Sequence, residues 1–144
     1  MSIEKSVLLF LVDDDPVFLK SLEIEFSLNT KSDIRTFSTG ELCLESLALN
    51  PDIIILDYRL DGVEAGAING LETLDRIKAF NPLIPVIILS SQDKIEVAVN
   101  CMKHQAFDYF VKSETAFLRL QKAITEIFHY QKIEKALSWY MEKM

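Results

Sequence analysis

The sequence is poor in glycine and proline, with only four of each among 144 residues. Collagen-like repeats, low-complexity segments and turn-dense all-β folds need a larger share of these residues, so these classes are excluded. Hydrophobic residues make up 49% of the chain, and no linker or internal repeat divides it. The sequence therefore predicts one globular domain with a substantial buried core.

Cysteine is scarce as well. Cys43 and Cys101 form no CxxC or Cys/His spacing, which argues against a disulfide framework and a zinc site and fits a reducing cytoplasm. The apolar run at residues 7–12 is too short for a signal-peptide core or a membrane span. We therefore expect a cytoplasmic protein with no membrane segment.

Positive charge is in deficit, with 15 Lys and Arg residues against 22 Asp and Glu residues and a net charge of −7. Such a chain repels phosphate backbones and anionic lipids. We therefore expect no direct contact with nucleic acid or membrane, and proteins or cations as partners.

Short apolar runs recur along the chain at residues 7–12, 53–56, 86–89 and 109–111, with a weaker run at 34–37. Because these runs lack polar alternation, they predict strands that are buried on both faces, as in a parallel sheet between helical layers. Helical patterns lie between them. A βα unit repeated five times predicts a doubly wound α/β domain with a five-stranded parallel sheet.

The helical patterns have start signals of their own. Asp15 precedes Pro16 as an N-cap, and apolar residues with a spacing of four, beginning with Phe18, continue a helix over about residues 16–28. Ser38 and Glu41 predict a capping box for a second helix over about 39–49. A third helix is expected before Asn81-Pro82, a fourth from Ile95, Ala98 and Met102, and a last one from Ser113 to the end of the chain.

Polar side chains stand where the predicted strands end. Asp13 and Asp14 follow the first strand, Asp57 the third, Ser90 the fourth and Lys112 the fifth. The carboxyl ends of parallel strands form the ligand-binding edge of such a sheet, and clustered carboxylates suit Mg²⁺. One carboxylate can then accept a phosphoryl group while Mg²⁺, a hydroxyl and Lys112 neutralise its oxygens.

Each of these residues also has a structural interpretation. Asp13 or Asp14 can stabilise a helix N-terminus, Ser90 can cap a helix and Lys112 can be a solvated strand end. Asp57 is different, because it follows four aliphatic residues at a buried strand end, where an unpaired charge is destabilising. Their coincidence on one edge favours a functional site.

Four segments, LVDDDP, PDIIILDYRL, PVIILSSQD and FDYFVK, resemble the receiver domain of two-component response regulators over about residues 6–130. The resemblance implies a flavodoxin-like sheet of order 2-1-3-4-5. It also implies that Asp57 is phosphorylated by a histidine kinase or phosphotransfer protein, and that phosphorylation shifts an equilibrium between two surface conformations.

The same resemblance assigns the remaining site residues. Asp13, Asp14, Asp57 and the backbone carbonyl of Arg59 would bind Mg²⁺. Ser90 and Lys112 would act on the phosphoryl group, and Ser90 with Tyr109 would form the switch. Such a domain is no enzyme toward a separate substrate and promotes only its own phosphorylation and dephosphorylation.

Two features depart from the family pattern. Ser113 replaces the proline that usually follows the lysine in a cis peptide. The loop from Asp57 to Gly70 is about five residues longer than usual, carries Asp61 at a position usually held by proline, and includes Gly62 and Gly66.

Residues 131–144 extend beyond the predicted receiver domain at 1–130. The apolar spacing of the last helix runs to Tyr130 and resumes at Ile133, Leu137, Tyr140 and Met144. This C-terminal helix extension is interpreted as a homodimer contact, a contact with another partner, or the stub of a linker to an output domain outside this sequence.

Two other functions fit parts of the pattern. A haloacid-dehalogenase-like phosphatase would use Asp13 as its nucleophile but leaves Asp57 without a role. A receiver-like binding module that is not phosphorylated would keep the fold without the chemistry.

Overall fold

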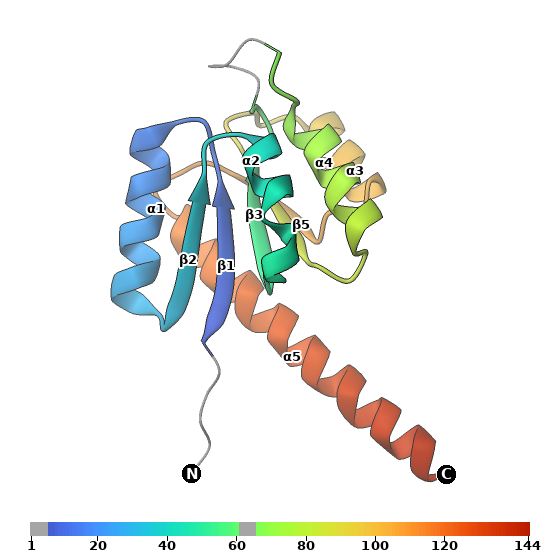
Figure 1. Ribbon diagram of the computed structural model, residues 1–144. Helices are drawn as coiled ribbons and strands as arrows, with labels where there is room; N and C mark the ends of the chain where they lie inside the picture. The colour runs from blue at the N-terminus through green and yellow to red at the C-terminus, as the bar shows by residue number, and fades with distance from the viewer. Residues whose placement is uncertain (1–5, 61–65) are drawn as a thin grey trace.

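The protein is described by a computed structural model for residues 6–60 and 66–144. Strands and helices alternate along the chain (Figure 1). The strands are β1 (Val7–Val12), β2 (Ser32–Phe37), β3 (Ile53–Asp57), β4 (Val86–Ser90) and β5 (Asp108–Val111). The helices are α1 (Pro16–Asn29), α2 (Gly40–Glu45), the 3₁₀ turn η1 (Leu47–Leu49), α3 (Gly70–Phe80), α4 (Ile95–Lys103) and α5 (Ala116–Lys143).

The five strands form one parallel sheet in the order β2-β1-β3-β4-β5. The predicted fold class and strand order are therefore confirmed. The chain order reverses between β1 and β3, so the carboxyl ends of these two strands flank the place where such sheets bind ligands.

Helices cover both faces of the sheet (Figure 1). Alternate residues of the central strands point to opposite layers, so Ile54 packs with α2, α3 and α4 while Ile55 packs with α1 and α5. Both isoleucines are at most 2% exposed. Each buried side chain of this size contributes about 1.5–3 kcal/mol to folding, which explains the unbroken apolar runs of β3 and β4.

The first turn of α1 forms as the sequence predicts. The Asp15 carboxylate accepts hydrogen bonds from the backbone amides of Val17 (3.0 Å) and Phe18 (3.3 Å), and Pro16 occupies the first turn. The Asp15 carboxylate thus serves as the helix N-cap, and its hydrogen bonds fix the backbone of the first turn, including Phe18.

The predicted capping box of α2 is wrong. Thr39, not Ser38, is the N-cap, and its hydroxyl accepts the amide of Leu42 over 3.2 Å. The Glu41 carboxylate accepts a hydrogen bond from the amide of Ile68 over 3.3 Å. The Glu41 side chain, which the local pattern assigned to the cap, therefore makes a tertiary hydrogen bond instead.

Helix α4 forms at the predicted place, but two of the residues that predicted it do not face the core. Ile95 and Met102 are 76% and 47% exposed, whereas Cys101 is fully buried. Its N-cap residue is Lys94, so Ser90 does not cap this helix.

The last helix begins at Ala116 rather than at Ser113, with Thr115 as its N-cap residue. Its first half packs on the sheet through Ala116, Leu120, Ala123 and Ile127, which are buried as the spacing predicts. No residue after Ile127 is buried. Figure 1 shows this second half leaving the domain at the end opposite the carboxyl ends of the strands.

The two ends of the segment between β3 and α3 are joined by a hydrogen bond. The amide of Gly70 donates a hydrogen bond to the carbonyl of Tyr58 over 3.0 Å. A Cβ at Gly70 would collide with the backbone carbonyls of Asp57 and Tyr58, so this approach requires glycine. The predicted loop residues Asp61 and Gly62 lie outside the described residues.

Candidate functional site

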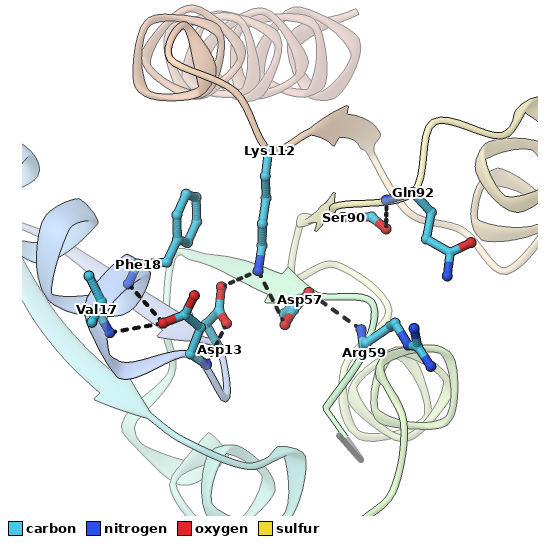
Figure 2. A network of polar contacts seen from close by, with 9 residues as sticks. Asp13, Val17, Phe18, Asp57, Arg59, Ser90, Gln92 and Lys112 are labelled. Carbon is cyan, nitrogen blue, oxygen red and sulfur yellow. Dashed lines mark hydrogen bonds and ion pairs between the residues drawn. The ribbon is translucent and has the colours of Figure 1, made fainter. Parts of the chain in front are cut away.

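Four strands deliver the candidate site residues to one edge of the sheet. Asp13 follows β1, Asp57 and Ser90 end β3 and β4, and Lys112 follows β5. Figure 2 shows the Lys112 side chain reaching between Asp13 and Asp57. The side chains of these two aspartates and of Ser90 are almost fully buried, at 3%, 4% and 0% exposure. The structure thus brings together residues that lie far apart in the sequence.

The Lys112 ammonium bridges the two buried carboxylates. Its Nζ lies 2.9 Å from Oδ2 of Asp13 and 3.4 Å from Oδ2 of Asp57. The backbone is fixed by β-pairing, because the amide of Lys112 donates to the carbonyl of Ser90 over 2.7 Å. The long side chain is directed by its contacts with the two aspartates and by the ring of Phe18, 4.7 Å from Nζ.

Asp57 has the most strongly perturbed carboxyl group of the site. Burial, and secondarily the charge of Asp13, raise the pKa of Asp57 from 3.8 to about 7, although Lys112 acts in the opposite direction. Burial also disfavours the Lys112 ammonium, but the contacts with Asp13 and Asp57 prevail, and the pKa of Lys112 is raised. Lys112 therefore stays charged, while Asp57 ionises near neutral pH and more readily beside a further cation.

The carboxylates form a set of donors that suits a hard divalent cation. One oxygen from each of Asp13, Asp14 and Asp57 lies within 4.8 Å of the others. Asp13 is also hydrogen-bonded through Oδ1 to the amide of Asp15 over 2.9 Å. Because one ammonium faces three acids, the cluster retains an excess of negative charge, and its oxygen donors fit Mg²⁺.

Ser90 and Tyr109 are connected through one residue of the β4–α4 loop. The Ser90 hydroxyl accepts a hydrogen bond from the amide of Gln92 over 3.0 Å, and the Tyr109 hydroxyl donates to the carbonyl of Gln92 over 2.6 Å. Burial raises the pKa of Tyr109, so its hydroxyl remains a donor. Ser90 and Tyr109 thus share a hydrogen-bonded neighbour, the backbone of Gln92.

Arg59 borders the site through its backbone. Its amide donates to Oδ1 of Asp57 over 3.4 Å, while its exposed side chain points away from Asp57 (Figure 2). No peptide bond in the described segments is cis, which includes the bond between Lys112 and Ser113. The Ser113 hydroxyl contacts Thr115 over 3.1 Å and does not reach the site.

Two contacts at this edge are not predicted by the sequence. Phe18 is assigned there only to the apolar face of its helix, yet its ring lies against the Lys112 ammonium. Its position three residues after the Asp15 cap, and hence at the strand-end edge, is the signal that points to it. Glu41, assigned to a cap, instead binds the backbone before α3.

The cysteines take no part in the site. Burial raises the pKa of Cys43 to about 12 and that of Cys101 to about 11, so both thiols remain protonated and unreactive. Among the described helices, none combines the length and the apolar character needed to cross a membrane.

Comparison with known proteins identifies relatives of this arrangement. The sequence model of the response regulator receiver domain matches residues 9–137. The DNA-binding transcriptional regulator NtrC of Escherichia coli K12 is 35% identical over 100 residues, which cover 67% of this chain and 20% of NtrC. The regulatory protein LuxO of Vibrio vulnificus YJ016 is 29% identical over 100 residues, covering 69% of this chain and 21% of LuxO.

Solved receiver structures share the fold. The signal receiver domain of a putative LuxO repressor protein from Vibrio parahaemolyticus superposes with a TM-score of 0.79 at 22% identity, covering 92% of this chain and 98% of that chain. The BeF₃-activated DrrB receiver domain gives a TM-score of 0.71 at 24% identity, with 84% and 99% coverage. The chain spans about a fifth of the length of the NtrC and LuxO proteins that it matches.

Proposed function

The chain belongs to the response regulator receiver domain family of two-component signalling, and we propose that Asp57 is the residue on which it accepts a phosphoryl group. One observation carries this proposal: at the end of the central strand, a carboxylate only 4% exposed lies beside another carboxylate and 3.4 Å from an ammonium. A buried charge at this position destabilises the folded protein. Stability therefore does not explain the presence of Asp57, and a functional role is favoured.

The chemistry follows from the three groups around Asp57. An Asp57 oxygen attacks phosphorus, a new O–P bond forms, and the bond from phosphorus to the donor breaks, with the electron pair leaving on the donor. Lys112 then shifts from Asp57 to an oxygen of the phosphoryl group, and the Ser90 hydroxyl donates to another. Asp13 keeps Lys112 at the site during this exchange, because its 2.9 Å contact with Nζ does not involve Asp57.

Mg²⁺ is proposed as the cofactor. Asp14, Asp57 and the backbone carbonyl of Arg59 would bind it directly, and Asp13 would bind it through water. When bound, Mg²⁺ supplies positive charge that favours ionised Asp57 and offsets charge on the transferred group. The clustered carboxylate oxygens and the raised pKa of Asp57 support this assignment.

The phosphoryl donor is proposed to be a histidine kinase or a phosphotransfer protein in the cytoplasm. We propose that the chain acts on no separate substrate and promotes only its own phosphorylation and dephosphorylation. DNA binding is stated in the name of NtrC, of which this chain matches about a fifth. A net charge of −7 argues against DNA contact by these residues themselves, so the signal leaves through protein contacts.

The switch is proposed to act through Ser90, Gln92 and Tyr109. When the Ser90 hydroxyl donates to a phosphoryl oxygen, its hydrogen bond with the Gln92 amide is rearranged. Because Tyr109 is attached to the carbonyl of the same residue, the change reaches β5 and the surface beside it. Two discrete arrangements of this loop would give the receiver two surfaces for its partners.

The extension at residues 131–144 is proposed to contact a second copy of this chain. Together with Tyr130, which precedes it, its exposed apolar residues have the 3-4-3-4 spacing of a coiled-coil seam, at Ile133, Leu137, Tyr140 and Met144. In a parallel pair, the flanking position of His129 faces Glu134 of the partner subunit, a complementary polar pair. About two heptads are available, so we expect a weak, concentration-dependent dimer.

The proposed phosphorylation is tested by labelling the full chain with acetyl phosphate and Mg²⁺ and weighing the intact protein. In this reaction acetate leaves as the O–P bond to Asp57 forms, so wild type gains the mass of one phosphoryl group. Asp57→Asn is the matched variant, because it keeps the shape of the side chain and removes the nucleophile. We expect no gain of mass in that variant.

Other outcomes identify the alternatives. Equal labelling of wild type and Asp57→Asn would contradict the assignment of Asp57. Labelling that is lost in Asp13→Ala and kept in Asp57→Asn would indicate the phosphatase-like chemistry. A wild-type chain that neither gains mass nor binds beryllofluoride would be a binding module that is not phosphorylated.

A further inference from the structure

The backbone around Lys112 does little to fix the conformation of its side chain. Its backbone is held by the hydrogen bond to Ser90, but the following residue, Ser113, is exposed, and its hydroxyl is hydrogen-bonded to Thr115 rather than to a group of the site. A lysine side chain has four rotatable bonds, and fixing it in one place is entropically unfavourable. Asp13 holds the ammonium from one side over 2.9 Å, and a second contact that does not involve Asp57 would restrict it further while its other carboxylate partner changes.

The ring of Phe18 provides such a contact. Its centroid lies 4.7 Å from Nζ of Lys112, within the range of a cation–π contact. Figure 2 shows the ring along the Lys112 side chain, on the side away from Arg59. The Lys112 side chain is only 18% exposed, so water weakens the attraction less than on an open surface.

Phe18 is itself held in place by two independent features. Its amide is hydrogen-bonded to the Asp15 cap over 3.3 Å, which fixes the first turn of α1. Its half-buried ring packs against the core layer between α1, α5 and the sheet. The ring is therefore a rigid surface and not a mobile cover.

An aromatic face has a property that a carboxylate lacks. It attracts the ammonium through the ring quadrupole but accepts no strong hydrogen bond, so the N–H groups of Lys112 stay available. Asp13 and Asp57 each engage one side of the ammonium at 2.9 and 3.4 Å. When a phosphoryl oxygen replaces Asp57 as the partner, the contact with the ring persists.

We propose that Phe18 is a positioning residue for phosphoryl transfer, which holds the Lys112 ammonium between Asp13 and the phosphoryl group on Asp57. This inference rests on the proposed phosphorylation of Asp57. Phe18 touches neither the donor nor the phosphoryl group. It acts through Lys112, and its effect depends on the presence of that lysine.

The test compares five variants of the full chain with wild type. Phe18→Leu keeps an apolar side chain and removes the ring face, while Phe18→Tyr keeps the ring. Leu19→Ala removes packing from the same core layer without a contact to Lys112 and serves as the matched control. Lys112→Ala is made alone and together with Phe18→Leu. The rate constant of labelling by acetyl phosphate is measured for each at saturating Mg²⁺.

We expect Phe18→Leu to label about tenfold more slowly than wild type, since a desolvated cation–π contact has this order of effect on an equilibrium. Phe18→Tyr and Leu19→Ala should label at the wild-type rate, although Leu19→Ala lowers the melting temperature. In the Lys112→Ala background, Phe18→Leu should have no further effect. Additive effects in the double variant, or an unchanged rate in Phe18→Leu, would overturn the proposal.

A second measurement does not depend on labelling. The ε-methylene protons of Lys112 lie near the ring face, so their NMR signals should be shifted upfield in wild type and Phe18→Tyr and return to ordinary values in Phe18→Leu. Unshifted signals in wild type would overturn the contact. Shifted signals in a wild-type chain that cannot be labelled would instead contradict the proposed phosphorylation of Asp57.

Discussion

The raised pKa of Asp57 makes the stability of the protein depend on pH. The substitution Asp57→Asn should remove this contribution to the pH dependence. In the unfolded chain the carboxyl ionises near its ordinary pKa of 3.8, whereas in the folded protein it ionises at about 7. Ionisation thus favours the unfolded state between these values. The penalty is absent below the unfolded pKa, grows as pH rises through the window from 3.8 to 7, and is constant above it.

The size of this penalty follows from the shift. Three pKa units at about 1.4 kcal/mol each give roughly 4 kcal/mol at pH 8, and the part of the shift that is expressed at pH 5 gives roughly 2 kcal/mol. Asp57→Asn removes the titration and keeps the shape. Without Mg²⁺, we therefore expect the free energy of unfolding of this variant to exceed that of wild type by roughly 4 kcal/mol at pH 8. At pH 5 the excess should be only roughly 2 kcal/mol.

Urea unfolding of both proteins at the two pH values, without Mg²⁺, measures this difference directly. Subtraction of wild type from variant cancels all groups that titrate alike in both. Asp93→Asn, which changes an exposed carboxylate beyond β4, is the control and should show no comparable gain in stability. An advantage of Asp57→Asn that does not grow between pH 5 and pH 8 would refute the attribution of the penalty to a buried, ionised Asp57.

Three further predictions concern the cation, the lifetime of the phosphoryl group and the C-terminal helix. Asp14→Asn should raise the melting temperature without Mg²⁺ by relieving repulsion and should reduce the rise that Mg²⁺ produces; an undiminished rise would exclude Asp14 as a ligand. Arg59→Ala and Gln92→Ala should each change the phosphoryl lifetime several-fold, which for Arg59 requires its outward-pointing side chain to turn toward the phosphoryl group; unchanged loss of the phosphorylated mass over time would assign control to the loop after β3. Leu137→Asp should abolish the concentration-dependent dimer seen by sedimentation, while the same charge at Ser138, outside the seam, should not; a wild-type chain that is monomeric at all concentrations would favour the linker interpretation.

The sheet and its functional edge could be predicted because their causes are local. An unbroken aliphatic run such as residues 53–56 requires burial on both faces, and a polar residue directly after it must lie at the strand end. Asp57 and Ser90 are located in this way, and the βα alternation brings their strand ends to one edge. These patterns indicate a Mg²⁺ and phosphoryl site in outline, whereas the individual roles of the three aspartates and of Tyr109 come from the resemblance to a family.

The sequence was a poorer guide wherever a distant residue decides the outcome. Glu41 fits a capping box, but the amide of Ile68 takes its carboxylate. The apolar residues of α4 lie on more than one side, so spacing alone could not tell that Cys101, rather than Ile95, faces the sheet. An aromatic residue at helical spacing such as Phe18 is ordinarily part of the core, and its contact with a lysine from the last strand exists only in the folded chain.

The hydrogen bond between Tyr58 and Gly70 fixes the two ends of the segment between β3 and α3 against each other. Once both ends of a loop are clamped, added length changes mainly the entropy of closure, and each doubling of a flexible loop costs only about 0.6 kcal/mol. The length of the segment therefore has little influence on the position of Asp57 in the sheet. This explains how a receiver domain can have a longer segment between β3 and α3.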